Sequence, residues 1–286
     1  MTRYEPVPLV YRYVEPRECD KEKAPLIFMH GLTASKEYWY ETPEVAANST
    51  KRRAYVIDSR NHGESPWSDV FNFDCNVDDI LHFMDTIGAP KAILIGHSMG
   101  GITAIKTALR EPERVERIVV EDVGVRRLQD EVIQMVRQRI ALMKVAIEKM
   151  PPGLDEVKAR KFIFDLIYDA LPPEIKKYMR VEENCYMIPL RPTEDGRWRF
   201  KSNLEGIDKA AQNASGIMTE STGLYQGLAL FIYGLQSPFR VGSDEPNIKR
   251  LFPNAEFVAV ENATHTVHND CPEVYTEALV AFLLKE

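Results

Sequence analysis

Short runs of apolar residues alternate along the chain with stretches in which apolar positions recur every three or four residues. A short continuous run is typical of a strand buried on both faces, and the wider spacing is typical of an amphipathic helix. The runs that predict strands are Leu26–Met29, Ala54–Ile57, Ala92–Ile95, Arg117–Asp122, Leu228–Tyr233 and Glu256–Val260, with an edge strand at Val7–Val14. Strands that alternate with helices predict an α/β fold with a mostly parallel, doubly wound sheet.

The alternation stops after the strand that ends at Asp122, and helical patterns follow as far as Thr222. Apolar residues between Leu128 and Met150 predict a long helix that is apolar on more than one side, and 162–170 predicts a second helix. A helix with two apolar sides needs a second apolar surface, which either the sheet domain or a hydrophobic substrate can supply.

An insertion of this length is too long for a plain loop and is typical of a cap or lid. The sequence therefore predicts a core formed by residues 1–124 and 223–286, interrupted by a helical cap of residues 125–222. Within this cap, Trp198–Phe200 predicts a short strand. After it the α/β alternation resumes, and a final helical pattern closes the chain.

The run Ala92–Ile95 leads directly into Gly96-His-Ser-Met-Gly100, and a helical pattern begins at Ile102. A strand, the pattern Gly-x-Ser-x-Gly and a helix in this order predict a nucleophile elbow. The backbone of such a turn is strained, and a side chain at either glycine would collide with the neighbouring strand or helix. Ser98 is thus predicted at a helix N-terminus, where backbone N–H groups favour a developing negative charge.

The composition limits which partners the protein can bind and in which cellular compartment we expect it. The formal net charge of −7 argues against nucleic acid or an anionic membrane surface as the main partner. No apolar run reaches the roughly 18 residues that a transmembrane helix needs, and the N-terminal residues have no signal-peptide or presequence pattern. The cysteines are Cys19, Cys75, Cys185 and Cys271, whose wide spacing favours reduced thiols. We therefore expect a cytoplasmic protein.

A serine hydroxyl is a poor nucleophile near neutral pH and needs an adjacent base, usually histidine. His265 follows the last predicted strand at the same sheet edge as Ser98, so it is the predicted base. His268 is the alternative, and its spacing from His265 with Asp270 close by also suggests a metal site. No cysteine or further histidine is placed to complete such a site, so we predict neither a metal nor a cofactor.

The histidine needs an acid that fixes its tautomer. In the commonest arrangement this acid follows the strand after the cap, but the turn that begins at Gly234 has no carboxylate before Asp244. Asp122 ends the strand that follows the elbow and lies at the correct sheet edge. We predict Asp122 as the acid and keep Asp244 as the alternative.

The oxyanion of a tetrahedral intermediate needs preorganised donors. The backbone N–H of Met99, beside the nucleophile, is one predicted donor, and the N–H of Leu32 in the turn after the first buried strand is the second. Trp39 and Phe239 are predicted to contact a hydrophobic part of the substrate.

These motifs resemble the α/β-hydrolase superfamily, and more narrowly the group that contains α/β-hydrolase domain-containing protein 11 and small bacterial esterases. The segments that carry the resemblance are His30-Gly-Leu32, Asp58-Ser-Arg-Asn-His-Gly-Glu-Ser-Pro66, Gly96-His-Ser-Met-Gly-Gly101, Asp122 and His265-x-x-His268. The resemblance implies a serine hydrolase of carboxylic esters, with acylglycerols or other lipid esters as substrates. Its catalytic triad maps onto Ser98, Asp122 and His265. Members of that group can be mitochondrial, which the resemblance implies here if a presequence has been removed.

The sequence thus predicts a cofactor-independent hydrolase of small, hydrophobic carboxylic esters. A thioesterase or a carbon–carbon bond hydrolase is the alternative among enzymes, because the same machinery serves any acyl transfer. A ligand-binding receptor or an inactive scaffold on the same fold is the alternative from another class. The sequence assigns no oligomeric state.

Overall fold

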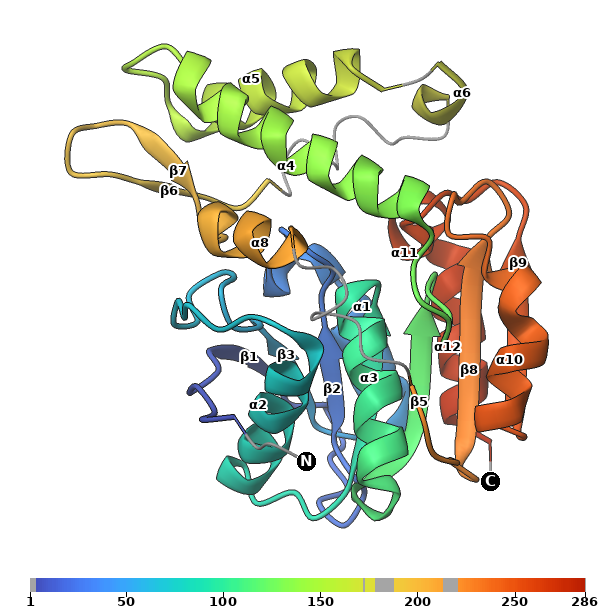
Figure 1. The fold of residues 1–286 in the computed structure, drawn as a ribbon. Helices are drawn as coiled ribbons and strands as arrows, with labels where there is room; N and C mark the ends of the chain where they lie inside the picture. Colours follow the sequence, from blue (N-terminus) through green and yellow to red (C-terminus); the bar gives the residue numbers. More distant parts are fainter. Residues whose placement is uncertain (1–3, 172, 178–187, 213–220, 286) are drawn as a thin grey trace.

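The computed structural model describes residues 4–171, 173–177, 188–212 and 221–285 (Figure 1). A seven-stranded sheet with the order β1-β3-β2-β4-β5-β8-β9 forms its centre. The strands are β1 (Tyr11–Val14), β2 (Leu26–Met29), β3 (Ala54–Ile57), β4 (Ala92–His97), β5 (Val115–Glu121), β8 (Leu228–Gly234) and β9 (Ala255–Val260). Only β1 runs antiparallel to its neighbour, and the other pairs are parallel. The predicted α/β fold with a mostly parallel, doubly wound sheet is confirmed.

The edge strand is shorter than predicted, because it begins at Tyr11 rather than at Val7. The backbone before it is bound by side chains instead of by a strand ladder. The N–H of Val7 donates to Asp79 Oδ1 at 2.8 Å, and the N–H of Val10 donates to Ser65 Oγ at 2.8 Å.

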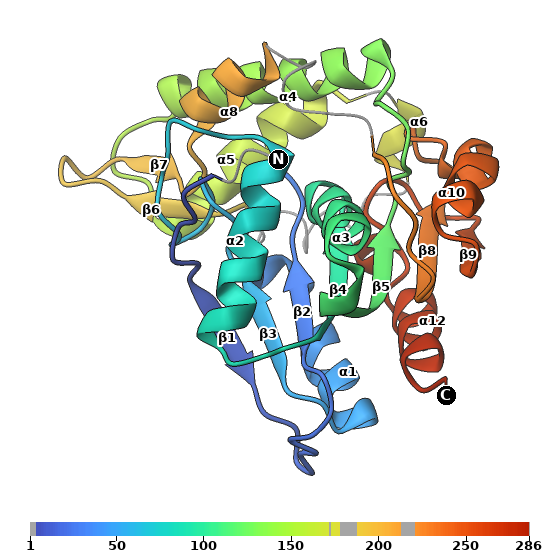
Figure 2. The same cartoon turned by 60° about the horizontal axis from the view of Figure 1, so that its bottom comes forward.

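Helices cover both faces of the sheet (Figures 1 and 2). They are α1 (Thr42–Thr50), α2 (Phe73–Thr86), α3 (Met99–Arg110), α10 (Glu245–Leu251), α11 (Val267–Asp270) and α12 (Pro272–Leu283), with 3₁₀ turns η1 (Lys36–Trp39), η2 (Pro112–Arg114) and η3 (Val241–Asp244). Apolar side chains of α2, α3 and α10 bury one face, and those of α1 and α12 bury the other. Burial on both faces explains why the central strands have no polar alternation.

The segment between β5 and β8 lies above the carboxyl ends of the strands (Figure 1). It contains α4 (Asp130–Lys149), α5 (Glu156–Asp169), α6 (Pro173–Lys176), the hairpin of β6 (Leu190–Pro192) and β7 (Trp198–Phe200), and α8 (Leu204–Ala211). Its elements share an apolar cluster of their own, formed by Met143, Ala146, Ala159, Ile163, Leu190, Phe200 and Leu204. Helix α4 packs on α5 and α8, so the segment itself covers part of the second apolar side of that helix.

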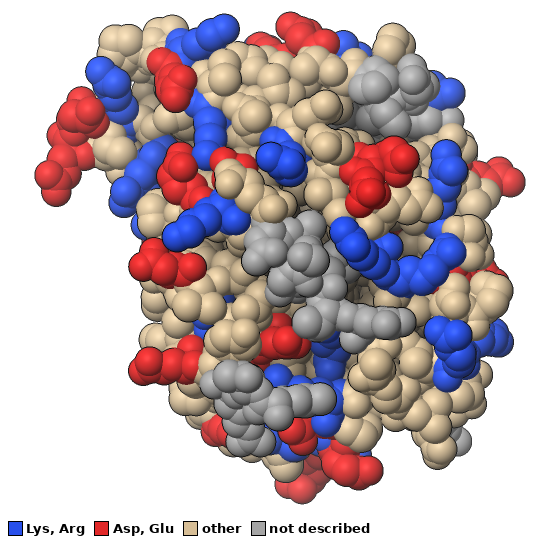
Figure 3. Space-filling view, in the orientation of Figure 1, with Lys and Arg blue, Asp and Glu red and all other residues tan. Residues whose placement is uncertain are grey.

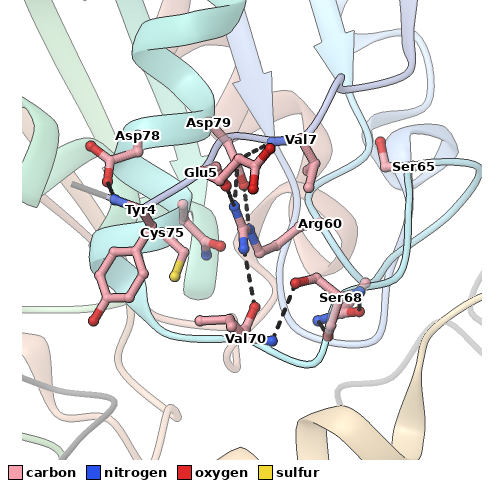
Figure 4. Close-up of polar contacts among 12 residues, drawn as sticks. Tyr4, Glu5, Val7, Arg60, Ser65, Ser68, Val70, Cys75, Asp78 and Asp79 are labelled. Carbon is pink, nitrogen blue, oxygen red and sulfur yellow. Dashed lines mark hydrogen bonds and ion pairs between the residues drawn. The ribbon is translucent and has the colours of Figure 1, made fainter.

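The loop after β3 is anchored by a buried ion pair (Figure 4). Arg60 donates from Nε to Asp79 Oδ2 at 2.6 Å and from Nη2 to Asp79 Oδ1 at 2.7 Å. The same guanidinium donates to the carbonyl oxygens of Val70 and Glu5. One side chain thus ties this loop and the N-terminal segment to α2.

The next residue of this loop contacts the segment above it. The carbonyl oxygen of Asn61 accepts the N–H of Asn203 at 2.8 Å, and the two side chains form a further hydrogen bond of 3.1 Å. The ring of Trp67 lies under the guanidinium groups of Arg191 and Arg199, at 5.5 and 5.3 Å from its centroid. Polar and cation–π contacts therefore join the β6–β7 hairpin to the sheet domain.

The surface and the thiols complete the description. Among the coloured residues of the face in Figure 3, acidic and basic side chains are interspersed. Within the described ranges, no helix is long and apolar enough to cross a bilayer. Cys19, Cys75 and Cys271 form no disulfide with one another, and Cys185 lies outside the described residues.

Replacing Asp79 with Ala leaves the Arg60 guanidinium buried without its carboxylate. Losing one partner of a buried ion pair typically costs about 3–5 kcal/mol, so we expect Asp79→Ala to lower the free energy of unfolding in urea by that amount. As a control, Lys161→Ala removes an exposed helical pair with Asp165 and should cost about 0.3–0.5 kcal/mol. Equal losses in the two variants would contradict the anchoring role of the buried pair.

Candidate active site

Ser98 occupies a strained turn between β4 and α3. Its φ of 53° and ψ of −113° lie in a region that residues with a side chain rarely adopt. A Cβ on Gly96 would lie 2.2 Å from the carbonyl carbon of Gly100, and a Cβ on Gly100 would lie 2.1 Å from the carbonyl oxygen of Met29. The turn has the crowding that the glycine spacing predicts.

Three predicted side chains form one hydrogen-bonded line. His265, on the loop after β9, places Nε2 at 2.9 Å from Ser98 Oγ and Nδ1 at 2.7 Å from Asp122 Oδ2. Because the ionised carboxylate only accepts, Nδ1 carries the proton and the lone pair of Nε2 faces the hydroxyl. In this tautomer the imidazole can take the hydroxyl proton, and the carboxylate stabilises the imidazolium that forms.

Asp122 is fully buried and is held by donors from the turn after β8. Its Oδ1 accepts the N–H of Gly234 at 3.0 Å, and its Oδ2 accepts the hydroxyl of Ser237 as well as His265 Nδ1–H. In the commonest arrangement the segment at the end of β8 carries the acid. Here it carries a hydroxyl and an N–H that donate to the carboxylate of Asp122, which follows β5. Sequence reasoning missed Ser237, and the only signal was a hydroxyl in a turn without a carboxylate.

Asp244, the alternative acid, binds the start of the segment above the sheet instead. Its Oδ2 accepts the N–H groups of Val125 at 2.7 Å and Arg126 at 3.0 Å. Its Oδ1 lies 2.6 Å from the Nε of Arg126. The structure does not bring Asp244 to His265.

His268, the alternative base, is directed away from Ser98. Its Nδ1 lies 2.7 Å from the carboxylate of Glu121, and the ring is buried. Asp270 accepts the N–H and the hydroxyl of Thr264. The side chains that suggested a metal site therefore bind different partners, and the described residues contain no cluster of three or more potential metal ligands.

The two predicted oxyanion donors lie on adjacent segments. Met99 is the first residue of α3, so its N–H has no partner within the helix. The turn that carries Leu32 packs against the elbow, because a Cβ on Gly31 would lie 2.5 Å from His97 Nδ1 and 3.4 Å from Ser98 Cβ. The turn of Leu32 and the elbow of Met99 therefore pack against each other.

His97, the second residue of the elbow, fixes the backbone of the loop after β9. Its Nε2–H donates to the carbonyl oxygen of His265 at 2.9 Å. Burial, together with the neighbouring His265 and His268, holds the pKa of His97 well below its usual range, so the ring is neutral. The hydrogen bond therefore links the elbow to the predicted base without adding a charge.

The structure separates the two aromatic residues that were predicted to contact substrate. Phe239 is half-buried, and its ring stacks on that of His265 with centroids 3.9 Å apart and planes at 4°. Trp39 is fully buried and packs against Phe28 and His268. Its prediction as a substrate contact is corrected, because η1 turns this side chain into the core beneath the site.

Comparisons with known proteins identify the family to which this fold belongs. A family described as alpha/beta hydrolase fold matches residues 24–164. The sn-1-specific diacylglycerol lipase ABHD11 of Danio rerio is 31% identical over 262 residues, which cover 92% of this chain and 79% of that protein. Ethanol acetyltransferase 1 of Cyberlindnera jadinii is 26% identical over 294 residues, which cover 97% of this chain and 87% of that protein.

A solved structure described as a marine microorganism esterase superposes with a TM-score of 0.77 at 26% identity. The match covers 96% of this chain and 99% of the esterase. The fold, the elbow motif and the sequence similarity point to the same family. The similarity covers 92% of this chain for the lipase and 96% for the esterase. The chain belongs to the α/β-hydrolase fold family.

Proposed function

We propose that this chain hydrolyses carboxylic esters, with Ser98 as nucleophile, His265 as base and Asp122 as the acid that orients it. The hydrogen-bonded line from hydroxyl to imidazole to buried carboxylate carries the proposal, with its distances of 2.9 and 2.7 Å. Relatives named as a lipase and as an esterase support an ester substrate. The strained elbow supports Ser98 as the nucleophile, because it presents the hydroxyl at a helix N-terminus.

In the proposed reaction, His265 takes the hydroxyl proton while Ser98 Oγ attacks the ester carbonyl carbon. The N–H groups of Leu32 and Met99 donate to the oxyanion of the tetrahedral intermediate. When the intermediate collapses, the carbon–oxygen bond to the alcohol breaks and His265 gives its proton to the leaving alcohol. Water then attacks the acyl-enzyme in the same way and releases the acid.

The proposed substrate has a hydrophobic acyl or alcohol part. The ring of Phe239 on His265 places an apolar surface beside the reacting groups. A relative named as a diacylglycerol lipase supports a lipid-like ester.

We assign residues 125–222 as a cap over this site, and residues 1–124 and 223–286 as the core. The apolar cluster within the segment and its polar contacts with the core support this division.

Replacing Ser98 with Ala removes the nucleophile and should lower kcat on p-nitrophenyl esters by on the order of a millionfold. A fluorophosphonate probe should label the wild type and fail to label the variant. Ser243→Ala, which removes an exposed hydroxyl, serves as the matched control and should keep both activity and labelling. Substantial turnover by a folded Ser98→Ala variant would remove the basis of the proposal.

A comparison of Asp122→Asn with Asp244→Asn tests the identity of the acid. An amide at residue 122 stabilises the wrong tautomer of His265, so kcat should fall by about 10⁴-fold. Asp244→Asn should loosen the start of the cap and leave kcat within about tenfold of the wild type, because Asp244 binds Val125 and Arg126 rather than the base. A reversed ranking in steady-state kinetics would mean that the acid is misassigned.

A second candidate function is acyl transfer to an alcohol, favoured by the similarity to an ethanol acetyltransferase over 97% of this chain. The acyl-enzyme would then be attacked by an alcohol instead of water. Chromatography of products formed from an aryl ester in dilute ethanol separates the two functions. We expect the free acid as the main product, and an excess of the ethyl ester would favour the transferase.

Thioesters of equal chain length test the thioesterase alternative in the same assay.

A further inference from the structure

Glu121, the last residue of β5, and Asp122, which follows it, face two histidines that come after β9, His265 on the loop and His268 on α11. Asp122 binds His265, and Glu121 binds His268. Glu121 Oε2 lies 2.7 Å from His268 Nδ1, and Glu121 Oε1 accepts the backbone N–H of His268 at 2.9 Å. The exposed fractions are 0% for Glu121 and 2% for His268. A second carboxylate–imidazole pair, to which the proposed reaction gives no role, is thus buried beside the first.

Both ring nitrogens of His268 face acceptors. Nδ1 faces the carboxylate of Glu121, and Nε2 lies 3.2 Å from the carbonyl oxygen of Tyr38. An ionised carboxylate and a carbonyl cannot donate, so both hydrogen bonds form only when both nitrogens carry protons. A buried charge is tolerated when it is paired and hydrogen-bonded. The hydrogen bonds therefore fit an imidazolium–carboxylate ion pair.

The rings packed around the Glu121–His268 pair are neutral and add no charge to it. The titratable groups around it are Glu121 on β5, His97 on β4, Tyr38 on η1, Tyr275 on α12 and, on the loop and helix of His268 itself, His265 and Asp270. Burial lowers the pKa of His97 and raises the pKa values of Tyr38 and Tyr275, so these three rings are neutral. His265 is engaged with Asp122, and Glu121 is the carboxylate within hydrogen-bond distance of His268.

The pair joins the segments that carry the proposed catalytic groups. Glu121 is the last residue of β5 and precedes the proposed acid, and His268 lies on α11, three residues after the proposed base. Tyr38 lies on η1, which follows the turn of the oxyanion donor Leu32. The ring of His268 also contacts that of His97 in the elbow, with centroids 5.4 Å apart. The buried ring of His268 therefore contacts β5, η1 and the elbow.

We propose that Glu121 and His268 form a positioning pair for His265. The pair ties the loop after β9 to the end of β5, so that the imidazole of His265 stays within hydrogen-bond distance of Ser98 and Asp122. His268 is too deeply buried to contact substrate, and it acts through the loop. This inference rests on the proposed function, in which His265 is the base.

The test measures kcat and KM for Glu121→Gln, His268→Gln and the double variant, each per active site titrated with a fluorophosphonate. Because a misplacement of about 1 Å can cost about 100-fold, we expect each single variant to lower kcat by about 10- to 100-fold. KM should stay within about twofold, because neither side chain contacts substrate. The double variant should be no slower than the slower single variant, because both changes break one interaction.

Asp79→Asn is the matched control, since it weakens a buried ion pair between the loop after β3 and α2. It should lower the Tm and leave kcat per titrated site unchanged. Where His268→Gln fails to fold, Glu121→Gln keeps the test available, because glutamine retains the size and one acceptor oxygen of Glu121.

A spectroscopic readout tests the ionic form directly. In histidine-labelled protein at neutral pH, the ¹⁵N signals that disappear in His268→Gln should have the shifts of an imidazolium with both nitrogens protonated. A neutral tautomer in the wild type would overturn the ionic form of the pair. Unchanged kcat per titrated site in both single variants would overturn the positioning role. If Ser98→Ala is also inactive, the proposed function survives that result, whereas an active Ser98→Ala variant overturns the proposed function itself.

Discussion

The close approach of β2, β4 and α3 at one turn is the constraint on which the rest of the site depends. Gly96 and Gly100 let backbone meet backbone at distances that no Cβ tolerates, and Ser98 takes the strained conformation between them. Such strain costs on the order of 1–3 kcal/mol and persists only where the surroundings enforce it. Here the fully buried β4 and the largely buried α3 enforce it, so a hydroxyl is fixed above the carboxyl edge of the sheet.

The neighbouring strand β5 is also followed by a residue with a positive φ. Asp122 has a φ of 52°, close to the 53° of Ser98, and both residues directly follow their strands. Each keeps the sheet hydrogen bonding at its N–H: Ser98 donates to the carbonyl oxygen of Glu121 at 3.0 Å, and Asp122 donates to that of Ile232 at 2.9 Å. The chain leaves the extended conformation only after it is anchored to the next strand. The positions of the proposed nucleophile and the proposed acid are thereby set by the register of β4, β5 and β8.

The sequence predicts what local patterns determine. The central strands, the elbow and the loop of His265 follow from apolar runs and glycine spacing. Its failures are of two kinds. The bond of Ser237 to Asp122 and the bond of the Val125 N–H to Asp244 join groups more than 100 residues apart, which no local pattern encodes. The orientation of Trp39 depends on the 3₁₀ turn before it, and β6 and α8 are too short to give a clear period.

The core holds the proposed catalytic groups at fixed distances, and the proposed cap over the site is packed separately from it. The proposed transfer of a proton from Ser98 to His265 requires distances held to a few tenths of an ångström, and the core favours this by burying strained backbone under apolar side chains on both faces. The cap instead has its own apolar cluster, and hydrogen bonds at Asp244 and Asn61 join it to the core. Separating two apolar surfaces costs about 25 cal/mol for each Å² exposed. The hydrogen bond at Asn61 is only part-buried, so water can replace it at lower cost, whereas the bond of Asp244 to Val125 is buried. These contacts lie outside the strained turn at Ser98, so the proposed cap is joined to the core without involving that turn.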